Sequence, residues 1–337
     1  MSAVVVFIIF AICLVIAIPI SISLGIVAVL PGAFDASFTA SAGYVIRSMV
    51  GGIDSFPLLA VPMFVLAGIL MAHGKISEKL FDVFVYFLGN KRAGIPCAVI
   101  ITCLFYGAIS GSAPATVAAV GSMTIPLLIE LGYEKDFSTA IVAVAGGLGV
   151  IIPPSIPFIM YAMATGESVS DLFLAGIVPG MMISALLIFY AYYYCRRHGE
   201  DREKIQAKMD QLKTKGFVNI LKESIWALLS PVIVLGCIYS GVASPTEAAV
   251  ISVFYSLFVS LFIYRSIKVK QIWGIMVEAM KTYAPILFIL ATSTAFSRVL
   301  TLMQVPQDVS AWIMTHFSNE IVLLIVINVV LLIVGMV

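Results

Sequence analysis

The stretch Gly107-Ala-Ile-Ser-Gly-Ser-Ala-Pro-Ala-Thr-Val-Ala-Ala-Val-Gly121 decides how this chain folds. It consists largely of small and hydroxyl-bearing residues, yet apolar runs flank it, Ile95 to Tyr106 before it and Val117 to Ile129 after it. Each run has about 12 to 16 residues, whereas a helix that crosses the hydrocarbon core of a bilayer needs roughly 20. The pattern therefore predicts a re-entrant hairpin, over about 94–130, that enters the membrane and returns to the same side.

The next apolar stretch, about 138–165, is interrupted by Gly146-Gly-Leu-Gly-Val-Ile-Ile-Pro-Pro-Ser155. Proline removes an amide hydrogen and glycine permits irregular backbone, so this stretch reads as a broken helix. Secondary transporters bind substrate and coupling ions where such a helix lies beside a hairpin tip. We favour that interpretation over the alternative, a small-residue packing surface between helices.

Backbone groups would dominate a site built from these two interruptions, because neither contains a charged side chain. Carbonyls at half-helix C-termini favour Na⁺, and amides at half-helix N-termini favour a carboxylate. The predicted site residues of the tip are Ser110, Gly111, Ser112, Ala113, Pro114 and Thr116. Those of the broken helix are Gly146, Gly147, Gly149, Ile152, Pro153, Pro154 and Ser155. The predicted Na⁺ ligands come from Ser110, Ser112, Gly147, Val150 and Ile152.

A second polar group of residues lies in a later apolar stretch and comprises Thr292, Ser293, Thr294 and Ser297. It has two interpretations that the sequence leaves open: hydrogen bonding between helices, or contact with substrate or sodium. Arg298 follows directly, and we expect its side chain to extend to the membrane surface. Binding of an anionic substrate is the alternative role for Arg298.

The hairpin motif resembles a known family. Ser110-Gly-Ser-Ala-Pro-Ala-Thr-Val-Ala-Ala-Val-Gly121, followed by Ile125-Pro126, closely resembles a signature of the large membrane subunit of tripartite ATP-independent periplasmic (TRAP) transporters, the DctM/SiaM-like family. Gly241-Val-Ala-Ser-Pro-Thr-Glu-Ala-Ala249 resembles a second signature, and the resemblance extends over the whole chain. It implies an elevator-type, sodium-driven importer of organic acids such as C4-dicarboxylates or sialic acid. The implied partners are a periplasmic substrate-binding protein and a small membrane subunit.

Composition sets the broad class: 61% hydrophobic and 11% charged residues exclude a soluble globular chain. We expect a carrier surrounded by membrane lipid, with no enzymatic activity and no nucleic acid partner. A proton- or sodium-coupled carboxylate carrier without a binding protein is the alternative function. A remote alternative, an intramembrane hydrolase using Ser110, would need a histidine or lysine base nearby. The three histidines fall at segment ends, and the five cysteines are scattered through apolar segments without metal-ligand spacing.

Charge predicts the orientation. If the basic segment 196–222 is cytoplasmic, all but two of the 19 Lys and Arg, namely Arg47 and Arg298, lie on the cytoplasmic side. The chain is then a multi-pass protein of a bacterial inner membrane with a periplasmic N-terminus.

Ser244-Pro-Thr-Glu247 predicts a capping box that opens a helix, so Glu247 is expected to be a structural cap.

Proline placement and hydropathy predict an inverted repeat. The first copy begins at Phe56-Pro57 and continues with a span and an amphipathic segment. The second copy begins at Ala284-Pro285, has the same order of segments and is predicted to have the opposite orientation in the membrane. In this alignment Gly107 falls opposite Gly335, so a second hairpin is expected beyond the end of this chain, which we therefore expect to be C-terminally truncated.

The predicted fold is all-α, polytopic and elevator-type, as in the ion transporter superfamily. Its predicted parts are scaffold spans and an interfacial arm (1–55), the first transport half (56–195), a cytoplasmic loop (196–222), scaffold spans and a second arm (223–283), and the start of the second transport half (284–337).

Overall fold

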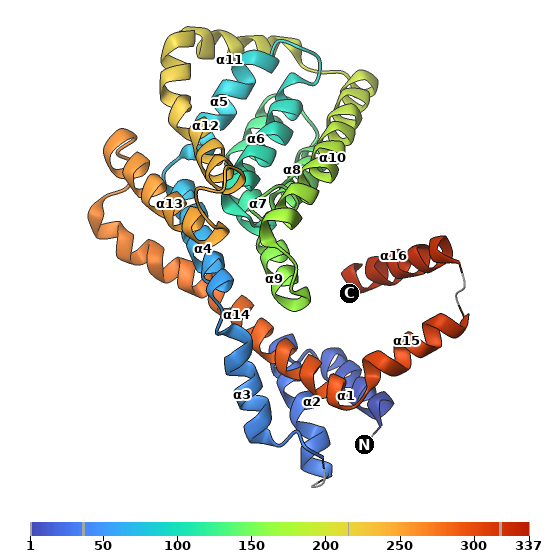
Figure 1. The fold of residues 1–337 in the computed structure, drawn as a ribbon. Helices are drawn as coiled ribbons and strands as arrows, with labels where there is room; N and C mark the ends of the chain where they lie inside the picture. The colour runs from blue at the N-terminus through green and yellow to red at the C-terminus, as the bar shows by residue number, and fades with distance from the viewer. Residues whose placement is uncertain (1, 36–37, 215, 317–318, 337) are drawn as a thin grey trace. The chain divides into compact units, whose positions relative to one another are not determined.

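The computed structural model describes residues 2–35, 38–214, 216–316 and 319–336, and every regular element in those ranges is a helix (Figure 1). Six described helical segments are long and apolar enough to cross a membrane: Phe56–His73, Ala113–Glu130, Val169–His198, Val218–Tyr239, Pro245–Ile263 and Val269–Leu302. The predicted all-α polytopic fold is confirmed. Packing divides the chain into two compact units, one of residues 1–54 with 286–337 and one of residues 55–285.

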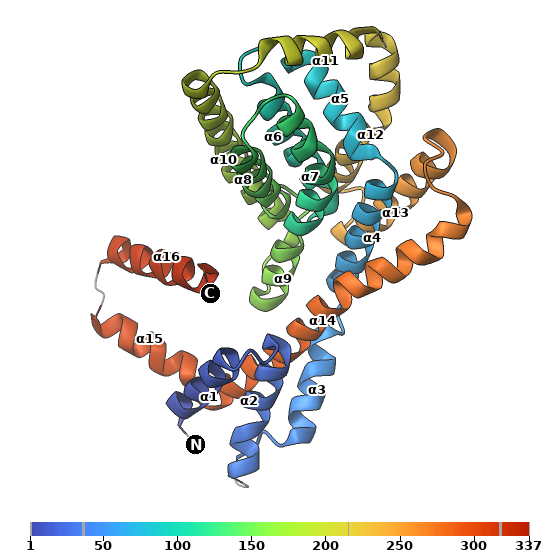
Figure 2. The same cartoon turned by 180° about the vertical axis from the view of Figure 1, so that it is seen from behind.

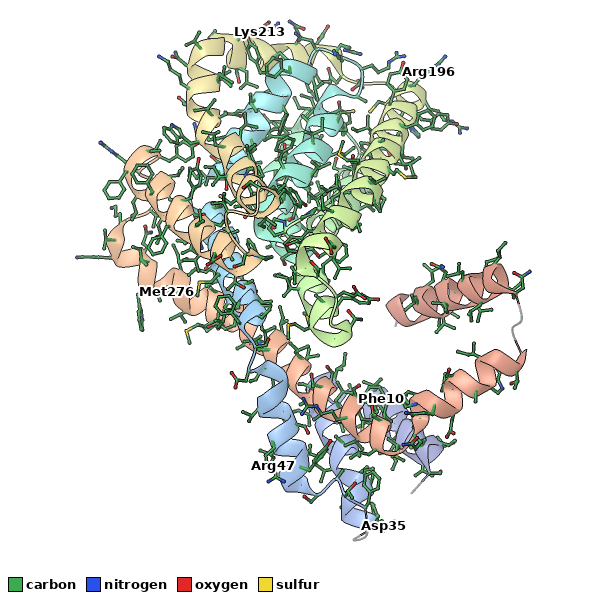
Figure 3. All side chains as sticks on the ribbon, viewed as in Figure 1. Phe10, Asp35, Arg47, Arg196, Lys213 and Met276 are labelled. Carbon is green, nitrogen blue, oxygen red and sulfur yellow. The ribbon has the colours of Figure 1, made fainter. Side chains whose placement is uncertain are left out.

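The first unit contains α1 (Ala3–Val15), α2 (Ile20–Phe34), α3 (Ala42–Ile53), the second part of α14 (Ile272–Leu302), α15 (Val305–His316) and α16 (Glu320–Met336). Its core joins α1, α2 and α3 to α14 through apolar side chains that include Val6, Val27, Val45, Phe296 and Val299. Phe10 of α1, labelled in Figure 3, stacks on Phe296 with ring centroids 6.0 Å apart.

The second unit contains the segments that the sequence predicts to form the site. Its elements are η1 (Phe56–Leu59), α4 (Ala60–His73), α5 (Ile76–Leu88), α6 (Gly94–Ser110), α7 (Ala113–Glu130), α8 (Lys135–Gly146), η2 (Gly147–Val150), α9 (Ile156–Thr165), α10 (Val169–His198), α11 (Arg202–Thr214), α12 (Phe217–Tyr239), α13 (Pro245–Phe258), η3 (Val259–Ile263), η4 (Val269–Gln271) and the start of α14. Helix α6 is central, because α4, α5, α7, α8, α10 and α12 all pack against it. Viewed from behind, Figure 2 shows α7 running beside α6.

The hairpin is present, and its arms are longer than the apolar runs in the sequence. Helices α6 and α7 have 17 and 18 residues and are separated only by Gly111 and Ser112. Together they span Gly94 to Glu130, the bounds that the sequence predicts. The helices are longer than the apolar runs of about 12 to 16 residues because alanine, serine and threonine next to the turn continue them. Gly111 ends α6 with a φ of 62°, a left-handed conformation that favours glycine, and Pro114 lies in the first turn of α7.

The segment 196–222 is not the simple loop that its charge suggested. It contains α11, which packs against α5 and buries Ile205, Met209 and Leu212. These three residues form one apolar stripe at helical spacing in an otherwise charged sequence. Figure 1 shows α11 lying across the ends of α5 and α6, and Figure 3 labels Lys213 at this end of the unit.

The predicted capping box at the start of α13 is confirmed. The Ser244 hydroxyl accepts a hydrogen bond from the Glu247 amide at 3.3 Å, and the Glu247 carboxylate accepts one from the Ser244 amide at 2.7 Å. Glu247 therefore stabilises a helix end, as expected.

A buried carboxylate that the sequence analysis did not single out joins both outer ends of the hairpin. The Glu200 side chain is only 2% exposed, and its Oε1 accepts hydrogen bonds from the Ala93 amide at 3.0 Å and the Tyr133 hydroxyl at 2.7 Å. Its Oε2 lies 3.3 Å from Nη2 of Arg202. Ala93 directly precedes α6 and Tyr133 follows α7, so one side chain stabilises the base of the hairpin. Burial, together with the hydrogen bond to Glu200, raises the pKa of Tyr133 well above its usual range.

We expect Glu200→Ala to lower the stability of the protein, because it leaves the Ala93 amide and the Tyr133 hydroxyl without their acceptor. A loss of about 1–3 kcal/mol is expected for buried polar groups left unpaired. The measurement is the thermal unfolding midpoint of the detergent-solubilised protein. Glu203→Ala is the matched control, since Glu203 is exposed on the same segment. Equal midpoints for the two variants would contradict the assignment of Glu200.

Candidate functional site

The structure brings the hairpin tip and the broken helix into direct backbone contact. A Cβ added to Gly107 of α6 would lie 2.6 Å from Cα of Gly149, in η2. A Cβ added to Gly149 would in turn lie 2.5 Å from Oγ1 of Thr116, on α7. Neither position has room for a side chain, so glycine at both positions permits the approach. The two interruptions predicted from the sequence therefore form one structural unit.

The turn of the hairpin also contacts the start of α9. The Ile156 amide donates a hydrogen bond to the Gly111 carbonyl at 3.3 Å. A Cβ on Gly111 would lie 2.9 Å from the Pro154 carbonyl oxygen. The N-terminal ends of α7 and α9 consequently lie on either side of this contact. Helix dipoles give both ends partial positive charge, which favours a nearby anion. At α9, however, the Ile156 and Phe158 amides are already bonded to Gly111 and Ser155, and the residue between them is a proline without an amide hydrogen.

Three neutral oxygens converge at the tip. Oγ of Ser110 lies 3.0 Å from Oγ1 of Thr116, which donates to the Ser112 carbonyl at 2.9 Å. The Ser110 hydroxyl lies 3.4 Å from the same carbonyl, so the three atoms form a triangle. The Ser110 and Thr116 side chains are buried. We call this group the oxygen triangle. Hydroxyl and carbonyl oxygens are hard donors that suit a small hard cation, so these residues fit Na⁺.

The other predicted Na⁺ positions have structural contacts of their own. The Val150 carbonyl accepts a hydrogen bond from the Ser155 hydroxyl at 2.6 Å. The Ile152 side chain packs against Gly180 of α10, where an added Cβ would lie 2.3 Å from Cδ1 of Ile152. A Cβ on Gly147 would meet nothing within 4 Å. The contacts thus group Ser110 and Ser112 with Thr116, the third hydroxyl-bearing residue of the predicted tip.

Ser155 and the helix α10 hold the broken helix in place. The Ser155 hydroxyl also accepts a hydrogen bond from the Phe158 amide at 3.4 Å and so caps α9. Gly176 allows α10 to approach the backbone of the broken helix closely, because an added Cβ would lie 2.5 Å from the Ile151 carbonyl oxygen. The sequence analysis missed Gly176 and Gly180. Their spacing of four residues is a helix-packing signal that could have found them.

A cavity of about 340 Å³ borders the hairpin on its α4 side. It is lined by Gly68 of α4, Tyr106 of α6 and the small residues Ala115, Ala118 and Ser122 of α7. The buried Tyr106 hydroxyl donates to the Gly68 carbonyl at 2.9 Å. The volume of the cavity falls within the range of roughly 300–1,000 Å³ typical of small-molecule sites. The cavity therefore provides space for a small ligand next to the hairpin.

Two carboxylates with polar partners border that cavity. His73 Nε2 lies 2.9 Å from the Glu278 carboxylate, and Glu78 forms a 3.9 Å ion pair with Lys75. Both glutamates thus have a partner, which reduces their repulsion of an anion. Sequence reasoning missed this arrangement because Glu278 is far from the other residues along the chain.

The polar residues of α14 belong to the first compact unit, which comprises residues 1–54 and 286–337. The hydroxyls of Thr292, Ser293 and Thr294 donate to carbonyls of their own helix at 2.9–3.1 Å. Gly52 of α3 packs against Thr294, where an added Cβ would lie 2.7 Å from the threonine Cβ. These contacts favour the helix-packing interpretation. Ser297 and Arg298 are exposed, and the Arg298 guanidinium lies beside Gly51, with Nη1 3.8 Å from a Cβ placed there.

Together, the apolar spans, the hairpin and the broken helix define a polytopic α-helical membrane protein with irregular backbone held inside a helix bundle. The chain belongs to the family described as "Tripartite ATP-independent periplasmic transporter, DctM component", whose model matches residues 7–337. Proteins of this family are transporter permeases and not enzymes.

Several relatives are similar over most of this chain. The isethionate TRAP transporter permease protein DctMQ of Oleidesulfovibrio alaskensis is 40% identical over 97% of this chain and 50% of its own length. The C4-dicarboxylate TRAP transporter large permease protein DctM of Pseudomonas aeruginosa is 38% identical over 84% of this chain and 65% of its own. The sialic acid TRAP transporter large permease protein SiaM of Vibrio cholerae is 33% identical over 86% and 66%. The chain thus spans between half and two thirds of the length of these relatives.

We expect Gly149→Ala to destabilise the protein, because its methyl group would displace the Thr116 hydroxyl and the Ser112 carbonyl. Overpacking of this kind costs about 1–3 kcal/mol. The measurement is the thermal unfolding midpoint in detergent. Gly236→Ala is the control, since a Cβ at Gly236 in α12 meets nothing within 4 Å. If Gly149→Ala unfolded at the same temperature as Gly236→Ala, the close approach described here would be wrong.

Proposed function

We propose that this chain is the large permease part of a sodium-coupled transporter that imports a small organic acid across the bacterial inner membrane. The observation that carries the proposal is the hairpin tip packed on the broken helix, with the oxygen triangle between Ser110, Ser112 and Thr116. Membership of the TRAP family supports it. The names of the relatives include isethionate, C4-dicarboxylate and sialic acid, all of which carry an acid group.

The oxygen triangle would hold the sodium ion. Bound Na⁺ would supply a positive charge at the tip without any change in protonation. The Ser110 and Thr116 hydroxyls and the Ser112 carbonyl already lie within 3.4 Å of one another, so little rearrangement is needed to bring them to one cation. A carboxylate would then be attracted by this charge and by the N-terminal end of α7.

The proposed mechanism is an elevator movement in which α6, α7, η2, α9 and α10 move as one body. Their mutual contacts support this, because close packing at Gly107, Gly149 and Gly176 leaves no room for the elements to slide past one another. A periplasmic substrate-binding protein would deliver the acid, and a small membrane subunit would complete the complex. In the proposed orientation, the N-terminus is periplasmic and the segment 196–222 is cytoplasmic.

Uptake should require an inward sodium gradient. The test uses the full reading frame of the gene, reconstituted in proteoliposomes with its partner subunit and binding protein. We expect uptake of the cognate organic acid with sodium outside, and loss of uptake when potassium replaces sodium. Equal uptake in potassium would contradict sodium coupling.

We expect Thr116→Val to weaken sodium activation selectively, because valine keeps the shape of threonine and removes one oxygen of the triangle. The sodium concentration for half-maximal uptake should rise by roughly tenfold or more, as for loss of one polar contact to a charged group. Thr124→Val is the control, since Thr124 is equally buried in α7 and makes the same type of bond to its own helix, to the Val120 carbonyl at 2.7 Å. An unchanged sodium requirement in Thr116→Val would exclude the oxygen triangle as the ion site.

A further inference from the structure

An apolar groove runs along the junction of α6 and α10, away from the hairpin tip. It has a volume of about 520 Å³. Cys97 and Ile101 line it on the α6 side, and Ala185, Ile188 and Phe189 line it on the α10 side. The Phe189 side chain is 69% exposed, so the groove opens at the surface of this compact unit. A membrane protein presents such a surface to lipid or to another apolar partner.

Basic side chains gather at one end of this groove. Lys91 and Arg92, in the turn before α6, line that end, and both are exposed. Neither forms an ion pair with any residue that the structure describes. The nearby carboxylate of Glu200 is buried and is already bound to Ala93, Tyr133 and Arg202. Two cations therefore remain available at the end of an apolar groove.

Helix α10 continues the same arrangement. Tyr192 lines the groove, and Arg196 follows it by four residues, which places both on the same face of the helix. Arg196 is exposed at the end of α10, as Figure 3 shows. Tyrosine is typical of the membrane–water interface, and Lys and Arg are typical of the cytoplasmic side. The groove thus changes from apolar to aromatic to basic along its length.

We propose that this groove binds an anionic phospholipid, with an acyl chain between α6 and α10 and its phosphate at Lys91 and Arg92. The apolar walls match an acyl chain, and the unpaired cations match the headgroup charge. A small soluble anion would not use the apolar walls. An uncharged helix of another protein would cover the walls but leave both cations unpaired. Because α6 is the first arm of the hairpin, the bound lipid contacts the element that carries the transport site.

The test measures lipid binding directly and needs no transport activity, so it is independent of the proposed function. The full reading frame is purified in detergent and titrated with phosphatidylglycerol or phosphatidylethanolamine of identical acyl chains, and bound lipid is counted by native mass spectrometry. We expect tighter binding of phosphatidylglycerol. Lys91→Gln with Arg92→Gln should weaken it by roughly thirtyfold, as expected for two basic residues at a membrane surface. Lys270→Gln with Lys281→Gln, an equal change at two exposed cations elsewhere in the unit, should leave it unchanged.

A second variant tests the acyl chain separately. Ala185→Trp should fill the groove and reduce binding of both lipids, whereas Leu186→Trp, at the neighbouring position with a 65% exposed side chain, should not. Ala185, Lys91 and Arg92 are exposed, so these changes leave the core intact. Equal affinity for the two lipids, or undiminished binding in the Lys91 and Arg92 variant, would overturn the proposal. Loss of a protein subunit from that variant, with lipid binding unchanged, would assign the groove to a protein interface instead.

Discussion

The contact between two backbones, at Gly107 of the hairpin and Gly149 of the broken helix, is the constraint on which the rest of the site depends. Irregular backbone is tolerated at membrane depth only where protein or enclosed water satisfies its polar groups. Here the protein does so: the Gly111 carbonyl accepts the Ile156 amide, and the Val150 carbonyl accepts the Ser155 hydroxyl. A side chain at either glycine would separate the two segments and break this mutual satisfaction.

The chemistry of the site follows from that contact. The same approach that excludes side chains brings together two helix N-termini and the oxygen triangle, so polar groups converge without any charged side chain. Such a site suits a cation and an anion bound together, because it contains no charged side chain that would bind either ion permanently.

Glycine and proline made much of this fold predictable from the sequence. They indicated a hairpin turn within Gly107–Gly121, a break within Gly146–Ser155 and the start of α13 after Ser244, because each imposes a local backbone geometry. The structure has the turn at Gly111 and the break at η2. The arms of the hairpin extend beyond the apolar runs because small residues next to the turn remain helical in a packed interior. The sequence also did not distinguish hydroxyls that bond only to their own helix, as in Thr292, from those that also bond to a second helix, as Thr116 does to Ser110.

Long-range contacts were not predictable in the same way. Helix α11 has only three apolar residues at helical spacing in a charged segment, and composition obscured them. Glu200 has no local signal at all, because its partners Ala93 and Tyr133 lie more than 60 residues away in sequence, at separations of 107 and 67. Its role depends entirely on how the chain returns to the base of the hairpin.

The most direct test of the central claim, that tip and break form one sodium-responsive unit, is the rate at which a cysteine at the tip reacts with a maleimide. Ser112→Cys, in a full-length protein whose native cysteines, including the five of this chain, are replaced, keeps the backbone carbonyl of the triangle and places a thiol beside it. The account predicts that sodium slows labelling and that potassium at the same ionic strength does not. Labelling at the same rate in both salts would contradict it.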